Sequence, residues 1–267
     1  MAEKQTQGGP AATGAALAPL PVQLSADFVS VDRGVTEVVV SGHVDTTTLA
    51  FVRDGDRYKT SLEMATVVRD ETGTVVATEP ERLSMDMTEA EHERLSREGL
   101  PYQKTVTLKR GTYDVRLTAG ALGVASQRVE VPDLAPGQLT LSSLFLLKAG
   151  AGAEAADPGA DLVLSQAVRR FRRDESLFVQ LYAYNAKRDS SGAASLVSQA
   201  EVLRGGAVLA TAAPEPVVTG DGGGPPVPHV SRIRLGSFEP GEYELRVTVT
   251  DRNANAAATR HVEFTVD

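Results

Sequence analysis

The sequence carries one motif twice, as RGTYDVRLT at residues 110–118 and as PGEYELRVT at residues 240–248. Both copies contain glycine, a spacer, tyrosine, an acid, an aliphatic residue, arginine, another aliphatic residue and threonine. Alternation of apolar and polar residues with a period of two is typical of a strand with one buried face. The motif therefore predicts a β-strand in each half of the chain, with Tyr113 and Tyr243 pointing into a core.

The opposite face of each predicted strand is polar. Arg116 and Arg246 lie on this outward face. An acid on the neighbouring strand can pair with such an arginine across the sheet, and we expect Glu130 and Glu263 to do so. Exposed pairs of this kind contribute only about 0.2–1 kcal/mol each, so they would add little to stability.

The match between the two halves extends beyond this motif. Residues 67–78 (VVRDETGTVVAT) resemble residues 201–211 (EVLRGGAVLAT), with a shorter turn in the second copy. Residues 126–131 (SQRVEV) resemble residues 259–264 (TRHVEF). Matching pieces in the same order predict two copies of one fold.

The glycine and the tyrosine of each motif are expected to have structural roles. Gly111 and Gly241 should lie at the turn that leads into the strand. A Gly-x-Tyr sequence at the start of a late strand is similar to the tyrosine corner of immunoglobulin-like sandwiches. In that arrangement the hydroxyls of Tyr113 and Tyr243 would donate hydrogen bonds to nearby backbone.

Period-two patterns recur along the rest of the chain, and one helix interrupts them. Thr88 and Glu91 can form a capping box at the start of this helix, and Gly99 follows where a helix would end. We therefore predict an all-β chain of two tandem β-sandwiches, immunoglobulin-like or fibronectin-III-like, with one short helix inserted in the first.

Composition sets the expected domain boundaries. Residues 1–21 lack the apolar core of a signal peptide and are broken by glycine and proline, which predicts a disordered tail. Residues 148–160 are mostly small, which predicts a flexible linker. We expect the first sandwich at residues 22–147 and the second at residues 161–267.

Bulk composition excludes several classes of function. The 267-residue chain has a formal net charge of −8, which argues against a nucleic-acid-binding protein. The sequence contains no cysteine, so it has neither disulfides nor thiolate metal ligands. No apolar run approaches the roughly 20 residues that span a bilayer. We expect no nucleic-acid partner, no membrane insertion and no cofactor.

Ser41, His43 and Asp45 have the residue types of a catalytic triad and share one face of a predicted strand. Residues two apart along a strand lie about 6.5–7 Å apart. A triad needs hydrogen bonds of about 3 Å between neighbouring members. We therefore interpret these residues as the polar face of a strand and expect no catalytic residues.

Three other stretches resemble ligand-binding motifs only in part. His92 begins a zinc-protease-like helix, but Ser96 stands where the second histidine is required. Asp54 and Asp56 lack the further oxygen ligands of a calcium loop and fit a hairpin turn. Residues 221–224 (DGGG) lack the lysine of a phosphate-binding loop. We expect no metal site.

The sequence RRFRR at residues 169–173 is a dense basic cluster. Three interpretations remain open for it: a solvated strand end, a contact with an acidic partner, or a contact with the neighbouring domain. Its members are possible interface residues, namely Arg169, Arg170, Arg172 and Arg173.

A second candidate interface lies in LTLSSLFLL at residues 139–147. Its first half alternates, whereas Leu144, Phe145, Leu146 and Leu147 are apolar on both faces. A strand covered on both sides has this pattern. We predict that the segment bridges the two sandwiches or docks on the second. The alternative is a last strand of the first sandwich with a few exposed leucines.

Several stretches resemble a known family. They include LSADFVSVDRGVTEVVVSGHVD at residues 24–45 and VEVPDL followed by LSSLFLL at residues 129–147. The chain resembles the C-terminal region of bacterial VWFA-related proteins, which are common in Acidobacteria. Members usually carry a signal peptide and a von Willebrand factor A domain with an Asp-x-Ser-x-Ser metal motif ahead of this region. That motif does not occur in this sequence, so no metal residue is carried over.

The resemblance and the predicted fold suggest a non-catalytic function. We expect a tandem β-sandwich scaffold or protein-interaction module of a larger exported or envelope-associated bacterial protein. Its partner would be another protein or an upstream domain of the same protein, and the sequence leaves the oligomeric state open. The alternative is a carbohydrate-binding accessory module of an enzyme, for which Tyr182 and Tyr184 are the candidate sugar-stacking residues.

Overall fold

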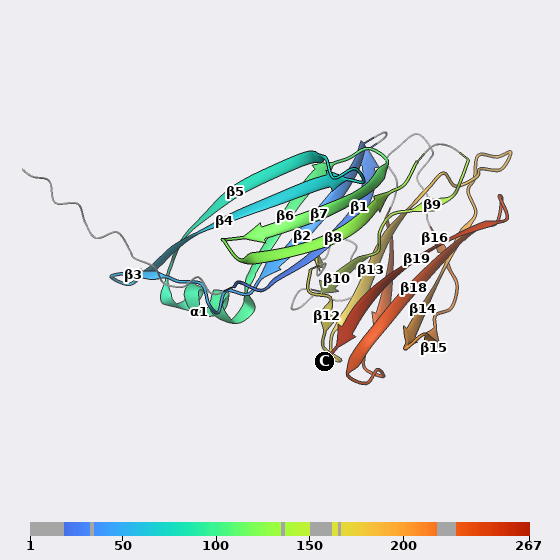
Figure 1. The fold of residues 1–267 in the computed structure, drawn as a ribbon. Helices are drawn as coiled ribbons and strands as arrows, with labels where there is room; N and C mark the ends of the chain where they lie inside the picture. The colour runs from blue at the N-terminus through green and yellow to red at the C-terminus, as the bar shows by residue number, and fades with distance from the viewer. Residues whose placement is uncertain (1–18, 33–34, 135–136, 150–161, 165–166, 218–227) are drawn as a thin grey trace, which may run out of the picture.

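A computed structural model describes residues 19–32, 35–134, 137–149, 162–164, 167–217 and 228–267. These residues form two β-sandwiches that lie side by side, with one α-helix at the far end of the first (Figure 1). The sheets are antiparallel apart from one short parallel pairing at the edge of the second sandwich. The prediction of an all-β fold with one short helix is confirmed.

The first sandwich contains one sheet of three strands and one of five. The smaller sheet has the order β1-β2-β6, formed by β1 (Val22–Asp32), β2 (Val35–Val44) and β6 (Leu100–Thr107). The larger sheet has the order β3-β4-β7-β8, and β5 also pairs with β4. Its strands are β3 (Val52–Asp54), β4 (Arg57–Asp70), β5 (Val75–Met87), β7 (Gly111–Ala119) and β8 (Gly123–Val131).

Alternation places the core of the first sandwich between these sheets. Val38 and Val40 of β2 are fully buried, as are Val115 and Leu117 of β7. Side chains of this size each contribute about 1.5–3 kcal/mol when they are fully buried. The repeated motif therefore supplies one wall of the core, as its apolar pattern predicts.

Helix α1 (Glu89–Glu98) begins and ends at the residues that the sequence indicates. The Glu91 carboxylate accepts a hydrogen bond from Thr88 N at 2.8 Å, and the Thr88 hydroxyl accepts one from Glu91 N. The helix ends at Gly99, which has a φ of 73°. None of its residues is buried, so α1 lies on the surface of the sandwich.

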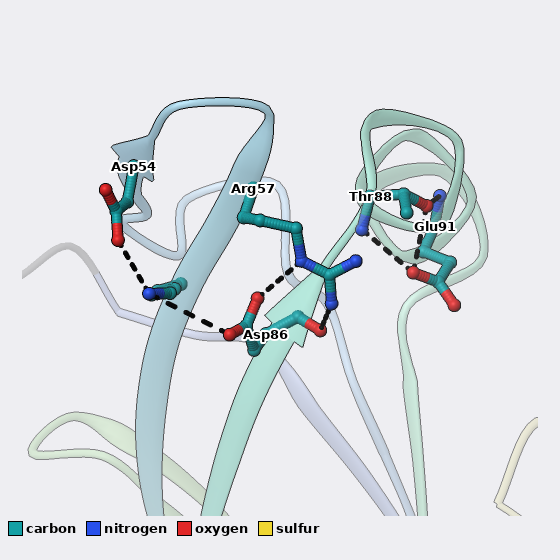
Figure 2. A network of polar contacts seen from close by, with 6 residues as sticks. Asp54, Arg57, Asp86, Thr88 and Glu91 are labelled. Carbon is teal, nitrogen blue, oxygen red and sulfur yellow. Dashed lines mark hydrogen bonds and ion pairs between the residues drawn. The ribbon is translucent and has the colours of Figure 1, made fainter.

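Polar contacts hold the strands beside the helix. Figure 2 shows Arg57, whose guanidinium Nε donates to the Asp86 carboxylate at 2.7 Å. Lys59 contacts Asp54 at 2.6 Å, and this bond lowers the pKa of the Asp54 carboxyl. Asp54 thus pairs with a lysine at a hairpin turn, in keeping with the turn interpretation of its sequence.

The second sandwich has the same general plan. One sheet has the order β11-β10-β13-β17 with β9 also on β13, formed by β9 (Thr140–Leu141), β10 (Phe145–Ala149), β11 (Leu162–Leu164), β13 (Ser176–Tyr184) and β17 (Pro228–Arg234). The other has the order β12-β19-β18-β14-β15 with β16 also on β14. Its strands are β12 (Arg170–Phe171), β14 (Leu196–Arg204), β15 (Ala207–Thr211), β16 (Glu215–Val217), β18 (Gly241–Asp251) and β19 (Ala256–Val266).

The boundary between the sandwiches differs from the prediction of residues 22–147 and 161–267. Strands β9 and β10 pair with β13, and Leu139, Leu141, Leu144 and Leu146 lie in the core of the second sandwich. The second sandwich therefore includes the chain from Leu139 onward, because these leucines lie in its core. Residues 150–160 of the expected linker and residues 1–18 of the expected tail lie outside the described residues.

The two copies of the motif occupy equivalent strands, β7 and β18. The Tyr113 hydroxyl donates to the Lys109 carbonyl at 3.0 Å, and the Tyr243 hydroxyl donates to the Glu239 carbonyl. Each hydroxyl thus bonds backbone four residues upstream, which is the geometry of a tyrosine corner.

Gly111 and Gly241 are the first residues of these strands, with φ values of 149° and 150°. This region of backbone conformation favours glycine. A Cβ on Gly241 would also lie 2.7 Å from the Arg204 guanidinium. The repeated glycine is therefore required by the turn into the strand.

The predicted cross-strand ion pairs are wrong in their partners. Arg246 pairs with Glu201 at 3.7 Å and with Glu244 at 3.6 Å, rather than with Glu263. The strand register explains this, because Glu201 of β14 lies directly opposite Arg246. In the first sandwich the residue on β8 opposite Arg116 is Ser126, not Glu130.

Candidate functional site: the interface between the sandwiches

Two adjacent serines connect the sandwiches through backbone hydrogen bonds. Ser143 N donates to the Phe28 carbonyl at 3.1 Å, and Phe28 N donates to the Ser143 hydroxyl at 3.0 Å. Ser142 N donates to the Tyr182 carbonyl at 2.9 Å, and Tyr182 N donates to the Ser142 hydroxyl at 2.9 Å. Phe28 belongs to β1 and Tyr182 to β13, so neighbouring residues bind one strand in each sandwich.

Tyr184 makes a second link between the two sandwiches. Its hydroxyl accepts a hydrogen bond from Ser30 N at 2.9 Å, and its ring packs into the core of the first sandwich. Burial raises the pKa of the Tyr184 hydroxyl well above its usual value. Ser30 follows Phe28 by two positions on β1, so Tyr184 and Ser143 bind the same edge of that strand.

A separate, small apolar cluster at the interface is centred on one phenylalanine. Phe145 is 5% exposed and packs with Val29 and Val39 of the first sandwich and with Tyr182 of the second. Its strand, β10, therefore has one face in the second core and one face against the first sandwich. This arrangement accounts for a strand that is apolar on both sides.

The four residues predicted as an interface thus have different surroundings. Phe145 contacts the first sandwich, whereas Leu144 and Leu146 belong to the core of the second. Leu147 is buried, and its neighbours in strand register are Leu164 of β11 and Phe178 of β13.

A buried carboxylate faces an arginine across the interface. Arg169 Nη2 donates to the Ser25 hydroxyl at 2.7 Å and lies 3.3 Å from an Asp27 carboxylate oxygen. The Ser25 hydroxyl also donates to Asp27. Burial raises the pKa of the Asp27 carboxyl, while Arg169 and the hydrogen bonds from Ser25 and Ser143 oppose this rise. Desolvation is the larger effect at this site.

Only one arginine of the basic cluster reaches the first sandwich. Arg169 makes this contact, so the interpretation as a contact with the neighbouring domain applies to it alone. The other three are exposed and bind residues of the second sandwich: Arg170 pairs with Asp267 at 3.6 Å, Arg172 with Asp174 at 2.7 Å and Arg173 with Glu239 at 3.9 Å.

A further arginine at the interface was not indicated by the sequence. Arg260 of β19 donates to the Leu141 carbonyl at 3.0 and 3.1 Å, and its guanidinium lies 5.5 Å from the centre of the Phe28 ring. Burial lowers the pKa of this guanidinium. A cation over an aromatic face contributes about 0.5–2 kcal/mol, depending on desolvation.

A polar cavity of about 330 Å³ lies between the sandwiches beside these groups. It is lined in part by Asp27, Gln127, Arg169 and Arg260. Of its charged side chains, Asp27, Arg169 and Arg260 make the interface contacts described above, so the cavity lies beside these contacts.

The residues of triad type are not assembled into a catalytic site. His43 Nε2 lies 2.7 Å from the Glu98 carbonyl and holds the end of α1. Asp45 accepts hydrogen bonds from the backbone and the hydroxyl of Thr47, which lower the pKa of its carboxyl. The Ser41 hydroxyl is buried and has no hydrogen-bond partner among the described residues.

The other motif residues also have structural surroundings. His92 stacks on the Tyr58 ring at 4.2 Å and meets Phe51 edge-on at 4.5 Å. No group of three or more metal-ligating side chains occurs within the described ranges. No helix in that part of the chain is long and apolar enough to cross a membrane. Residues 221–224 lie outside the described residues.

The candidate sugar-stacking residues lie at the interface. Tyr184 is buried and Tyr182 is half-buried against Phe145. The two rings therefore do not form an exposed aromatic platform, which a carbohydrate-binding module would present to a sugar.

No family model and no curated protein matches the chain. Among solved structures, the chain is similar to Escherichia coli alpha-2-macroglobulin activated by porcine elastase, at 12% identity and a TM-score of 0.28 over 93% of this chain. It is also similar to Salmonella alpha-2-macroglobulin reacted with methylamine, at 11% identity and a TM-score of 0.34 over 92% of this chain. The chain spans 23% and 24% of the length of these two proteins.

Proposed function

We propose that this chain is a non-catalytic tandem β-sandwich scaffold, or protein-interaction module, of a larger exported or envelope-associated bacterial protein. Its role would be to hold a protein partner, or an upstream domain of the same protein, at a fixed distance and orientation. The resemblance to the C-terminal region of VWFA-related proteins motivates the exported context.

The observation that carries this proposal is the interface made by Ser142 and Ser143. A flexible tether leaves two domains free to move, and relative motion is the default for domains joined in one chain. Here consecutive residues bond strands of both sandwiches, and Phe145, Tyr184 and Arg169 add contacts around them. A pair of sandwiches fixed in this way is suited to a spacer or a docking platform.

The surroundings of the polar residues support a non-catalytic role. His43 holds the end of α1, and His92 stacks between aromatic rings. Asp27, the buried acid at the interface, is bound by Ser25 and Arg169. Each of these groups already has a structural partner.

Binding to the upstream region of the full-length protein tests the proposal. The purified chain would be titrated with the region that the gene encodes ahead of it, and binding would be measured by calorimetry. We expect a saturable complex that is weakened by substitutions on the exposed surface of either sandwich. No binding, together with no cross-links between the two regions in the intact protein, would refute the proposal. A specific hit on a glycan array would instead favour the carbohydrate-binding alternative.

A further inference from the structure

The polar cavity between the sandwiches has the location and the size of a small-ligand site. Its volume is about 330 Å³, and its walls come from β1 and β8 of the first sandwich and β19 of the second. Figure 1 shows β8 and β19 on the facing sides of the two sandwiches. Ligand pockets occur preferentially at domain interfaces and have volumes of about 300–1,000 Å³. This cavity lies at the small end of that range.

Arg169 lines the cavity and has a donor that the surrounding protein does not bind. Its side chain is 23% exposed, and Nη2 makes all of its contacts with Ser25 and Asp27. Its Nε is buried and has no hydrogen-bond partner among the described residues. A buried donor on a charged group is costly without an acceptor. An acceptor from a ligand would remove this cost.

Arg260 lines the same cavity and is also only partly bound. Its Nε and Nη2 both donate to one acceptor, the Leu141 carbonyl. A guanidinium has five N–H donors, and the others on Arg260 have no hydrogen-bond partner in the described part of the chain. Burial lowers the pKa of this guanidinium, so water solvates it incompletely. The two arginines therefore bring unused cationic donors to one cavity.

The charges around the cavity favour an anion with a single charge. Three arginines and two acids line it: Arg128, Arg169, Arg260, Asp27 and Glu130. This lining has an excess of positive charge, whereas the whole chain has a formal net charge of −8. Arg128 also pairs with Glu71 at 3.7 Å, but both side chains are exposed, so solvent screens the pair. The two acids disfavour a multiply charged anion such as phosphate.

A carboxylate fits these donors in shape as well as in charge. Guanidinium groups bind carboxylates in a planar geometry with two parallel hydrogen bonds. The cavity holds a ligand of roughly ten non-hydrogen atoms, since one water occupies about 30 Å³ of liquid. Gln127, Ser143 and Thr259 also line the cavity, so polar substituents on such a ligand would find partners there.

We propose that this cavity binds a small organic carboxylate, which accepts hydrogen bonds from the unused donors of Arg169 and Arg260. Both arginines belong to the second sandwich, whereas Gln127 and the β1 wall belong to the first. The ligand therefore contacts both sandwiches and stabilises their docking, because a ligand that binds only the docked state shifts the equilibrium towards it.

Calorimetric titration with lactate tests the proposal. Lactate carries a carboxylate and a hydroxyl, and lactamide is the matched control because it has the same skeleton without the charge. We expect lactate to bind at one site with a Kd on the order of 1 mM, as small ligands make few contacts, and lactamide not to bind. The ionic strength is held constant with sodium chloride, so that screening of the chain's own charge does not change.

An arginine substitution locates the site. Arg260→Gln should weaken lactate binding at least about tenfold, because hydrogen bonds to charged groups are strong. Arg232→Gln is the matched control, since Arg232 also lies over an aromatic ring, 5.9 Å from the centre of Phe178, but does not line the cavity. It should bind lactate like wild type. Melting temperatures of both variants verify that they fold.

A gain of affinity separates a binding role from structural damage. Glu130 is an exposed acid that lines the cavity. Glu130→Gln removes a negative charge near the ligand and should strengthen lactate binding about two- to fivefold. A variant with a damaged interface would bind lactate more weakly, so only an electrostatic effect at the site gives this sign.

Solution scattering tests whether the ligand connects the sandwiches. Phe145→Ala removes an apolar contact between them, and lactate should reduce the radius of gyration of this variant whereas lactamide should not. Four results would overturn the proposal: no lactate binding well above the expected Kd, equal binding of lactamide, undiminished binding by Arg260→Gln, or unchanged or weaker binding by Glu130→Gln. An unchanged radius of gyration would refute the connection between the sandwiches.

Discussion

Replacement of Phe145 by alanine should uncouple the two sandwiches. Phe145 is 5% exposed and is the central side chain of the apolar cluster with Val29 and Val39 of the first sandwich. Phenylalanine-to-alanine substitutions in cores cost about 3–5 kcal/mol. We expect the lower end, about 3 kcal/mol, because the cluster is small. A free-energy change of 1.4 kcal/mol is a factor of ten in an equilibrium constant. The equilibrium constant for docking of one sandwich on the other should therefore fall about 100-fold.

Calorimetry and solution scattering measure this effect. We expect one cooperative unfolding transition for the wild-type chain, and two resolved transitions with a larger radius of gyration for Phe145→Ala. Leu146→Ala is the control, because Leu146 is fully buried in the core of the second sandwich and points away from the interface. It should lower the melting temperature without a change in domain orientation. An unchanged thermogram and scattering profile for Phe145→Ala would show that Phe145 does not couple the sandwiches.

Three further predictions concern individual residues. Tyr113→Phe and Tyr243→Phe should each destabilise the chain by about 1 kcal/mol, because each hydroxyl donates to a backbone carbonyl; unchanged urea midpoints for both would contradict the tyrosine-corner role. Gly241→Ala should destabilise by about 1–3 kcal/mol, since φ is 150° and the new Cβ would meet Arg204; chemical denaturation with no loss would contradict the strain. The raised pKa of the Asp27 carboxyl means that the folded state holds its proton more tightly than the unfolded state, so stability from this group falls as pH rises above its ordinary value of 3.8. Asp27→Asn should therefore gain stability relative to wild type as the pH rises above this ordinary value, and a difference of the opposite sign in urea titrations would contradict this direction.

The fold could be predicted from the sequence because its strands alternate and repeat. The motif at β7 and β18 combines inward aliphatic residues with a glycine and a tyrosine that act locally, within four residues along the chain. Local features of this kind can be recognised directly from a short stretch of sequence. The capping box of α1 is of the same type, and its limits match the expected ones.

The interface could be predicted only in part, because its contacts join residues far apart in sequence. The apolar pattern of LTLSSLFLL indicates a strand covered on both faces, and Phe145 fits that reading. The pattern does not show which side chains face the second core, so the boundary was expected after Leu147. Ser142 and Ser143 were not identified as interface residues from the sequence. Their position between apolar residues could have indicated them, because a serine hydroxyl among buried side chains usually binds backbone groups. Asp27 and Arg169 could not be paired without the fold.

The contacts of β1 explain why the interface is part of the fold and not an accessory to it. Strand β1 is an edge of its sheet, with β2 on one side. On its other side, the Ala26 carbonyl accepts from the Gln127 side chain at 3.2 Å, the Phe28 amide binds Ser143, and the Ser30 amide donates to Tyr184. The last two partners come from the second sandwich. Without it, these groups on the first sandwich would be open to pairing with another chain. The second sandwich therefore covers an edge strand of the first and at the same time fixes the orientation of the two sandwiches. The contacts of Ser143 and Tyr184 with β1 thus contribute both to stability and to domain orientation.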